Sequence, residues 1–177
     1  FNDTGYNNIF FGHFAGRSNT TGSGNVFFGD EAGRFNGAGS DNIFFGSQAG
    51  YNNDGNSNIF SGFAAGRSNT TGSNNIFSGY QAGYSNTTGS NNIVIGYDID
   101  LPSATQSNSL NIGNLLYGTG IDGSGTSTLS TGNIGIGTTT PTARLSVQNN
   151  VVNKNILQLQ DAAGQSAPQI LFTDSLG

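Results

Sequence analysis

The sequence contains no cysteine, methionine or tryptophan, one histidine, and few charged residues. Without cysteine, disulfides, thiolate catalysis and cysteine-based metal sites are excluded. Lys and Arg number 5 against 10 Asp and Glu, so the net charge is -5 and no basic surface is available to attract nucleic acid or an anionic membrane. No apolar run reaches the ~20 residues that span a bilayer as a helix. We therefore expect no nucleic-acid partner and no membrane insertion within these residues.

Hydrophobic residues are also scarce, at 33%, whereas glycine (29 residues) and phenylalanine (13 residues) are abundant. Disordered chains combine low hydrophobicity with high net charge, but only 8% of these residues are charged. The apolar residues must therefore be placed economically in a fold that needs little core. The chain begins at Phe1, part-way into a repeat, and ends at FTDSLG without a terminal signal, so we expect it to be a segment of a longer polypeptide.

A repeated phrase fills the first part of the chain. An asparagine is followed by Ile or Val, then Phe or Val, then a variable residue and a glycine, and an Ala-Gly pair begins three residues later. Successive copies are spaced by 17, 17, 16, 17 and 17 residues, with anchors at Asn8, Asn25, Asn42, Asn58, Asn75 and Asn92. Ser109, followed by LNIG, begins a weaker seventh copy, and GNIGIG at 132–137 has a similar pattern.

A unit of this length is too short for two packed helices, and its apolar triplet between Gly, Asn, Ser and Thr predicts a short strand between turns. We predict an all-β fold, a parallel β-solenoid or β-roll in which each 17-residue unit is one rung and rungs stack at about 4.8 Å. The two recurring glycines fit sharp corners, and the alanine fits a site that accommodates only a methyl group. The anchor asparagine either hydrogen-bonds to its equivalents in adjacent rungs or forms a turn before the strand.

Both faces of the predicted strand are apolar. Adjacent side chains in a strand point to opposite faces, yet the Ile and the Phe positions are apolar in every unit. The returning chain of the same rung can cover one face, and the other needs a partner, since burying a large apolar side chain is worth ~2 kcal/mol. The sequence thus predicts self-association. The next residue changes along the chain, without evident reason, in the order Phe11, Phe28, Phe45, Ser61, Ser78 and Ile95.

The phrases GSNNIFSGYQAG and SNNIVIG resemble the head repeats of trimeric autotransporter adhesins and, more closely, the repeat regions of bacteriophage tail-fibre and related bacterial surface-fibre proteins. The passage from Asn108 to Val147 resembles the segment that, in many such fibres, leads towards a C-terminal self-cleaving intramolecular chaperone. The rung is longer and richer in Phe than those of the autotransporter heads. The resemblance implies an intertwined parallel homotrimer, a shaft or adhesive head, and an extracellular location at a cell surface or on a virion.

The composition divides the chain into three parts. Residues 1–98 are predicted to form the six-rung β-solenoid. Residues 99–131, with Pro102 and the stretch GTGIDGSGTSTLSTG, are predicted to form the weak seventh rung and a Gly/Ser/Thr-rich neck. Residues 132–177 are predicted to form a strand-rich β-module, incomplete at its C-terminus, with strands at ARLSV, ILQLQ and QILFT.

Residues suited to catalysis are few, and we predict no enzyme activity, no cofactor and no metal site. His13 falls at a rung position that elsewhere holds Asp, Ser, Phe or Tyr, which indicates a tolerant outer site. Asp98 and Asp100 alternate in YDID and share one side of a strand, where they form either a calcium site or a solvated exit from the solenoid. Asn-x-Ser/Thr matches, which a repeat rich in Asn and Thr produces by composition, lie at Asn2, Asn19, Asn69 and Asn86.

The function that the sequence favours is that of a structural segment of an extracellular or virion trimeric fibre that mediates attachment to a cell surface. Its partners would be copies of itself and a surface glycan or protein receptor. Aromatic faces and arginine forks suit glycans and acidic groups. The candidate contact residues occupy variable corner positions: Phe14, Arg17, Arg34, Tyr51, Phe63, Arg67, Tyr80, Tyr84 and Tyr97. The alternative interpretation of these residues is packing between adjacent corners.

Two other function classes stay open at this point. A polysaccharide-degrading tailspike would need two carboxyl groups roughly 5 to 9.5 Å apart across a groove. The chain could supply such a pair from Asp30, Glu31, Asp98 or Asp100. An ice-binding surface would need a continuous threonine array, which the units FNGAGS and NNDGNS interrupt.

Overall fold

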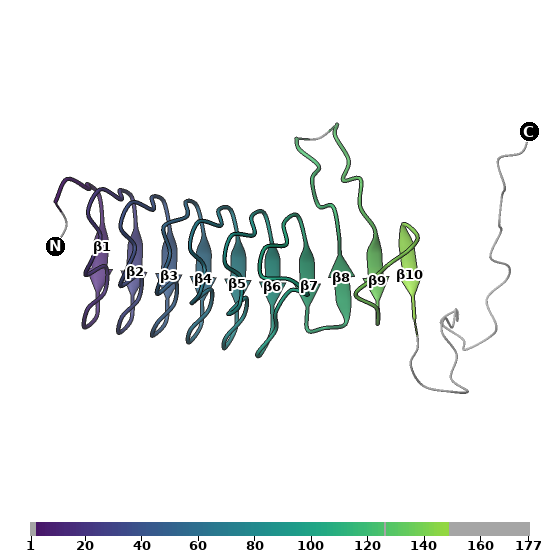
Figure 1. Cartoon of the computed structure of the whole chain (residues 1–177), viewed down its shortest axis with the longest axis horizontal. Coiled ribbons are helices and arrows are strands. Elements are labelled where there is room, and N and C mark those ends of the chain that lie inside the picture. Colours follow the sequence, from purple (N-terminus) through teal and green to yellow (C-terminus); the bar gives the residue numbers. More distant parts are fainter. Residues whose placement is uncertain (1–2, 126, 149–177) are drawn as a thin grey trace, which may run out of the picture.

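The computed structural model describes residues 3–125 and 127–148 of the chain. Each repeat contributes one three-residue strand, and the strands lie side by side in chain order in a single 10-stranded sheet (Figure 1). No helix occurs among the described residues. The strands are β1 (Ile9–Phe11), β2 (Val26–Phe28), β3 (Ile43–Phe45), β4 (Ile59–Ser61), β5 (Ile76–Ser78), β6 (Ile93–Ile95), β7 (Leu110–Ile112), β8 (Leu116–Gly118), β9 (Ile134–Ile136) and β10 (Leu145–Val147).

Strands β1 to β7 pair in parallel, each with the next, and equivalent residues of successive rungs face one another. This confirms the parallel β-solenoid of about six turns with rungs of about 17 residues. The rung of 16 residues keeps the register, because Ile43 still pairs with Ile59. Its missing residue falls at a corner, where Asp54 Oδ1 accepts hydrogen bonds from the backbone N–H groups of Gly37 (2.6 Å) and Ala38 (3.1 Å).

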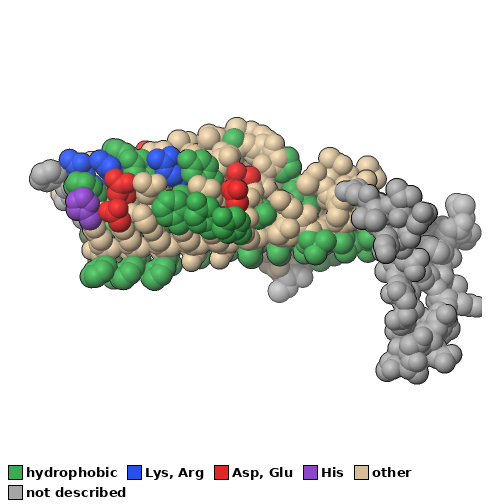
Figure 2. Space-filling view, turned by 90° about the horizontal axis from the view of Figure 1, so that it is seen from below, with side chains coloured by type: hydrophobic (Ala, Val, Ile, Leu, Met, Phe, Trp, Pro, Cys, Tyr) green, Lys and Arg blue, Asp and Glu red, His purple; other side chains and the backbone are tan. Residues whose placement is uncertain are grey.

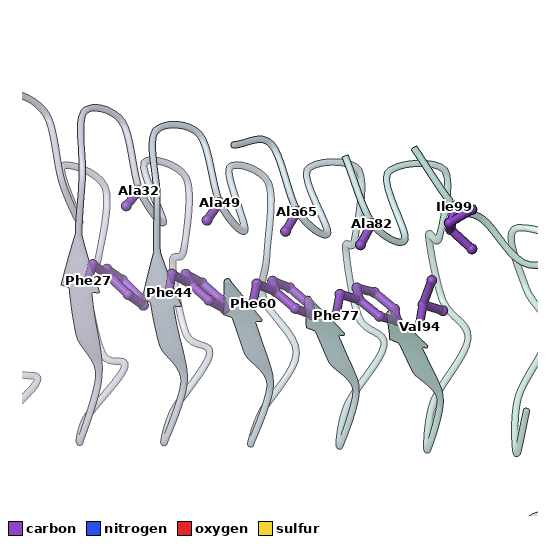
Figure 3. Close-up of a cluster of buried hydrophobic side chains, with 10 residues drawn as sticks. All are labelled: Phe27, Ala32, Phe44, Ala49, Phe60, Ala65, Phe77, Ala82, Val94 and Ile99. Carbon is purple, nitrogen blue, oxygen red and sulfur yellow. The ribbon is translucent and has the colours of Figure 1, made fainter. Parts of the chain in front are cut away.

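The core is a stack of phenylalanine rings that project from the middle position of each strand (Figure 3). The rings of Phe27, Phe44, Phe60 and Phe77 are fully buried, and neighbouring centroids lie 4.7–4.9 Å apart with nearly parallel planes. On the returning chain, buried alanines face this stack at Ala32, Ala49, Ala65 and Ala82. The alanine methyl groups are thus buried within the core cluster.

The last turn fills the same space with a different pair of residues. Val94 stands where the other rungs carry Phe, and Ile99 stands where they carry Ala, and both are buried against the stack. The smaller strand residue and the larger loop residue compensate each other in volume, so close packing continues to the end of the solenoid.

Glycine occupies three columns, one more than the repeated phrase contains. Gly66 has φ +59 and Gly62 has φ +134, so both predicted corner glycines adopt a backbone that other residues rarely adopt. A Cβ on Gly66 would lie 2.5 Å from the Phe60 ring. In the third column the backbone is ordinary, but a Cβ on Gly72 would collide with the carbonyl oxygen of Gly89 in the next rung. This column is therefore required by the closeness of the rungs.

Two columns of asparagine are buried inside the solenoid. Hydrogen bonds connect the anchor column from rung to rung. The backbone N–H of Asn75 donates to Oδ1 of Asn58 (2.9 Å), and Nδ2 of Asn75 donates to the Gly89 carbonyl (2.8 Å). This confirms the hydrogen-bonding interpretation of the anchor. A second column, which the repeated phrase did not reveal, comprises Asn19, Asn36, Asn53, Asn69 and Asn86, and Nδ2 of each from Asn36 onward donates to Oδ1 in the preceding rung.

The rung pattern continues beyond residue 98. The backbone N–H of Gly83 donates to the Ile99 carbonyl (2.8 Å), and that of Thr87 donates to the Ala104 carbonyl (2.7 Å), so residues 99–108 complete the sixth turn. Strand β7 then begins the weak seventh copy and pairs in parallel with β6.

After β7 the chain reverses. Strand β8 runs antiparallel to both β7 and β9, and β10 is parallel to β9, so these strands extend the same sheet. The loop between β8 and β9 projects away from the row of strands (Figure 1). Within it, Thr131 donates to Asp122 from its hydroxyl (2.6 Å) and from its backbone N–H (2.7 Å), which holds the pKa of Asp122 below its ordinary value. The strands predicted at ILQLQ and QILFT lie outside the described residues.

The glycine contacts generate a prediction with a matched control. Gly66→Ala should lower the free energy of unfolding by ~2–4 kcal/mol, because it combines left-handed backbone strain with overpacking against Phe60. Gly113 has the same φ of +59, but a Cβ placed on it would meet nothing within 4 Å, so Gly113→Ala should cost only ~1–2 kcal/mol of strain. Urea unfolding of both variants measures the difference, and equal losses would contradict the packing argument.

Candidate functional site

The structure gathers the candidate contact residues into two columns along the solenoid. Equivalent positions stack from rung to rung, so residues that are far apart in sequence become neighbours. The first, which we call the arginine column, contains Arg17, Arg34, Tyr51, Arg67 and Tyr84 at equivalent positions, together with Phe14, whose ring contacts the first two arginines. The second, which we call the tyrosine column, contains Phe63, Tyr80 and Tyr97. Charged and hydrophobic side chains gather over this side of the turns (Figure 2).

In the arginine column, guanidinium groups alternate with aromatic rings. The Phe14 ring lies between two of them, with the Arg17 Cζ 4.8 Å and the Arg34 Cζ 5.1 Å from its centroid. Further along, Arg67 lies over the Tyr51 ring at 4.8 Å and near the Tyr84 ring at 5.8 Å. Each such contact is worth ~0.5–1 kcal/mol at an exposed site. The column therefore contributes to holding neighbouring corners together.

Hydrogen bonds connect the same side chains across rungs. Glu31 forms an ion pair with Arg34 and accepts a hydrogen bond from Gln48 Nε2 (2.9 Å). The Nε–H of Arg67 donates to Gln48 Oε1 (3.2 Å), and its Nη1 donates to the hydroxyl of Tyr84 (3.3 Å). The network thus runs from Glu31 to Tyr84. These contacts supply a structural role for the arginines whether or not a ligand binds them.

The tyrosine column is a stack of rings on the outside of the turns. The centroids of Phe63 and Tyr80 are 5.3 Å apart, and those of Tyr80 and Tyr97 are 4.9 Å apart, with nearly parallel planes. The facing surfaces of the rings are therefore occupied by one another, although all three residues are partly exposed. Tyr97, at the end of the stack, is 74% exposed. A ligand would meet polar hydroxyls and ring edges along this column.

Three of the carboxylates considered for chemistry, Asp30, Glu31 and Asp100, have side-chain partners in the protein. Asp30 Oδ1 lies 3.3 Å from Nδ1 of the exposed His13. Asp100 accepts hydrogen bonds from the backbone N–H (3.0 Å) and the hydroxyl (2.8 Å) of Ser85. No group of three or more His, Asp or Glu residues that could hold a metal ion occurs in the part of the chain that the structure describes. Calcium binding by Asp98 and Asp100 stays an untested interpretation.

The asparagines of three sequons belong to the second buried column. Asn19 and Asn69 are fully buried and Asn86 is 3% exposed. Their Nδ2 groups donate to glycine carbonyls three residues ahead. A glycan on any of these nitrogens would break the column, so the folded chain cannot carry one there. Asn2 lies outside the described residues.

The outward face of the sheet is apolar and lies apart from both columns. We call it the outer face, and it is formed by the first and third residues of each strand, whereas the middle residue points into the core. The rings of Phe11, Phe28 and Phe45 stack on it at 4.6 and 5.0 Å. Its most exposed apolar side chains are Ile9, Phe11, Phe28, Ile43, Phe45, Ile59, Ile76, Ile95, Ile112, Ile134, Ile136 and Leu145. The returning chain covers one strand face and leaves this one open, as the two-sided apolar pattern predicts.

Within the described residues there is no helix of the length and hydrophobicity needed to cross a membrane. No family model, curated protein or solved structure matches the chain. The resemblance to fibre proteins therefore depends on the repeat phrases alone.

The arginine column yields a prediction about stability. Arg67→Ala should lower the free energy of unfolding by ~1–2 kcal/mol, because it removes the contacts with Tyr51 and Tyr84 and the hydrogen bond to Gln48. Tyr84→Phe keeps the ring and removes one acceptor, so its cost should stay near ~0.5 kcal/mol. Denaturant melts of the two variants provide the comparison, and an unchanged Arg67→Ala protein would show that the column contributes nothing to folding.

Proposed function

We propose that this chain is a structural segment of a homotrimeric fibre, extracellular or on a virion, that mediates attachment to a cell surface. The observation that carries the proposal is the outer face. It continues along the whole 10-stranded sheet, and no strand in the described residues contains a charged residue.

The size of the outer face supports association with other chains. A fully exposed large apolar side chain presents roughly 150–250 Å², so at the observed exposed fractions the face offers on the order of 1,000 Å² of apolar surface. Monomeric soluble proteins rarely expose apolar patches above ~300–600 Å². A stable interface covers ~800 Å² on each partner. The outer face therefore has the dimensions of an interface.

A second and third copy of the chain fit this surface. The face is long, apolar and free of charge, so its partner must be equally long and uncharged, and the same face on another copy meets both conditions. Solenoids grow in one direction as rungs are added, which suits a shaft. The number three, the parallel arrangement and the extracellular location follow from the resemblance to fibre proteins, and the neck after the solenoid follows from the Gly/Ser/Thr-rich composition of residues 99–131.

The corners are the proposed contact with a receptor. They remain outside an assembly that uses the outer face, and their side chains vary from rung to rung while the core positions repeat. The tyrosine column offers hydroxyls and ring edges to a glycan or a protein. Glycan hydrolysis has less support, because Glu31 is ion-paired and Asp100 is hydrogen-bonded to Ser85. Incubation with surface polysaccharide should leave its chain length unchanged, and shortening would favour the tailspike alternative.

Assembly through the outer face can be tested by sedimentation. The parent chain should sediment as a trimer, and Ile43→Asp should release folded monomers, because it would bury an unpaired carboxylate at the interface. Tyr97→Asp introduces the same charge at a corner and should leave the trimer intact. Phe60→Ala should instead destabilise each chain by ~3–5 kcal/mol, since this ring is fully buried within the rung. A monomeric parent would defeat the proposal of a trimer.

Attachment can be tested separately from assembly. Tyr80→Ala should reduce binding of the fluorescently labelled trimer to host cells while the sedimentation profile stays that of the parent. Thr71→Ala, an exposed change on a different corner, serves as the control and should bind as the parent does. Unchanged binding of Tyr80→Ala together with a similar Tyr97→Ala result would remove the tyrosine column from the receptor contact.

A further inference from the structure

The two columns of the outer face differ in composition. The first column holds the first residue of each strand, except that the antiparallel β8 contributes its last residue; in sheet order it contains Ile9, Val26, Ile43, Ile59, Ile76, Ile93, Leu110, Gly118, Ile134 and Leu145. The third column holds the third residue of each strand, except that β8 contributes its first residue; in sheet order it contains Phe11, Phe28, Phe45, Ser61, Ser78, Ile95, Ile112, Leu116, Ile136 and Val147. The first column is nearly uniform, whereas the third is a block of rings, then two serines, then a block of aliphatic residues.

A uniform repetitive face cannot fix the alignment of two chains. Rungs are ~4.8 Å apart, and a slip by one rung on the first column would exchange almost every contact for an equivalent one. Only the rung lost at each end would oppose the slip. Something other than the first column must therefore select one alignment if a defined assembly forms.

The serines make a gap in the third column. Phe28 has a stacked ring on each side and is 43% exposed, whereas Phe45, whose neighbour on one side is Ser61, is 58% exposed. Ser61 and Ser78 are half-buried between strands that carry larger residues. Seen in profile along the lower edge of Figure 2, the hydrophobic row is interrupted before it resumes towards the C-terminal strands.

We propose that Ser61 and Ser78 set the axial register and the parallel direction in which copies of this chain pack through their outer faces. The inference rests on the proposed self-association and goes beyond it, because a trimer could form without a register device.

In the aligned arrangement, rings meet rings, serines meet serines and aliphatic residues meet aliphatic residues. The serine hydroxyls can then hydrogen-bond to one another, so no buried polar group is left without a partner. A parallel slip by one rung brings Phe45 of one copy against Ser61 of the next. It also sets a serine hydroxyl against an apolar side chain, and leaves a void where the ring was expected.

An antiparallel arrangement fails for a related reason. The block order reverses, so with full overlap the serines of one copy face aliphatic residues of the other. Bringing the serines into contact would then require a shift that uncovers strands at both ends. Ser61 and Ser78 thus disfavour both the one-rung slip and the antiparallel arrangement. In exchange, their own two rungs bury less apolar area at the interface, as single buried polar residues do in coiled coils.

The test compares two double variants in the same rungs. Ser61→Phe with Ser78→Phe makes the third column continuous, and the fold should accept it because the chain already carries Phe there in three earlier rungs. Ile59→Phe with Ile76→Phe adds the same rings to β4 and β5 in the first column and keeps the serines. Circular dichroism establishes that both variants are folded.

Sedimentation velocity is the principal measurement. The parent and the Ile59/Ile76 variant should each give one narrow trimer peak. The Ser61/Ser78 variant should give a broad distribution with larger species, because slipped copies leave uncovered strands that recruit further chains.

Disulfide trapping reports the register directly. The chain has no cysteine, so Ile95→Cys and Ile112→Cys can be introduced into separately tagged chains, which are then mixed, refolded and oxidised. A disulfide needs Cα atoms roughly 4.4–6.8 Å apart. Aligned copies therefore form like pairs, which join position 95 to 95 or position 112 to 112, whereas copies that slip by one rung form mixed pairs, which join position 95 to 112. Mixed pairs should rise roughly tenfold in the Ser61/Ser78 variant and stay at the parent level in the control.

The outcomes separate the two proposals. A monomeric parent would overturn self-association, and the register inference with it. A trimeric parent whose Ser61/Ser78 variant keeps a narrow peak would overturn the register inference alone. Broad peaks in both variants would also overturn it, since added bulk rather than loss of the serines would then be responsible.

Discussion

The fold depends on one constraint, the in-register parallel pairing of a strand with its equivalent in the next rung. Phe27 pairs with Phe44, and Asn25 and Asn42 each come directly before their strands. Each side chain therefore lies one strand spacing away from the same or a similar residue in the next rung. That spacing suits aromatic rings, which stack at 4.7 Å here, and amides, which can donate and accept along the same column. The rung therefore uses residue types that interact favourably with identical residues in adjacent rungs.

The same constraint explains how so little apolar content supports a fold. Two asparagine columns are buried beside the phenylalanine stack, and each amide replaces lost water with hydrogen bonds to adjacent rungs. Such columns are satisfied only while the repeat continues. The Oδ1 atom of Asn86 is buried without a partner, at the point where the following rung carries Ser103 instead of Asn. Polar burial is thus inexpensive within the solenoid and costly at its end, which favours long uninterrupted arrays.

Strands, rung length and two glycine columns were predictable, because each is a residue type recurring at a fixed spacing. The spacing did not indicate which of the two apolar positions faces the core, because Ile and Phe recur equally regularly. The columns at the corners were predictable as positions, since equal spacing places Arg34 and Tyr51 in adjacent rungs, but not as contacts, because the cation–π geometry depends on rotamers. The second asparagine column, which includes Asn69, recurs as regularly as the anchors and was predictable from the same spacing. The exchange of Phe and Ala for Val94 and Ile99 depends on single substitutions, which a repeat pattern does not encode. The reversal into β8 depends on a turn at Gly113 and Asn114, both with positive φ, and the repeat pattern does not encode this turn either.

A solenoid needs similar interior residues in successive rungs, whereas an assembly with a defined alignment of its chains needs outward residues that differ between rungs. The interior of this chain is nearly uniform, because any departure leaves a ring or an amide without its neighbour. The outward positions escape that requirement: Ser61 replaces Phe45 in its column without disturbing the buried ring of Phe60 beside it. Adjacent residues of a strand point to opposite faces, so the residue that stacks in the core is next to one that points outward. Outward residues can therefore vary for assembly or recognition while the stacking that holds the rungs together stays intact.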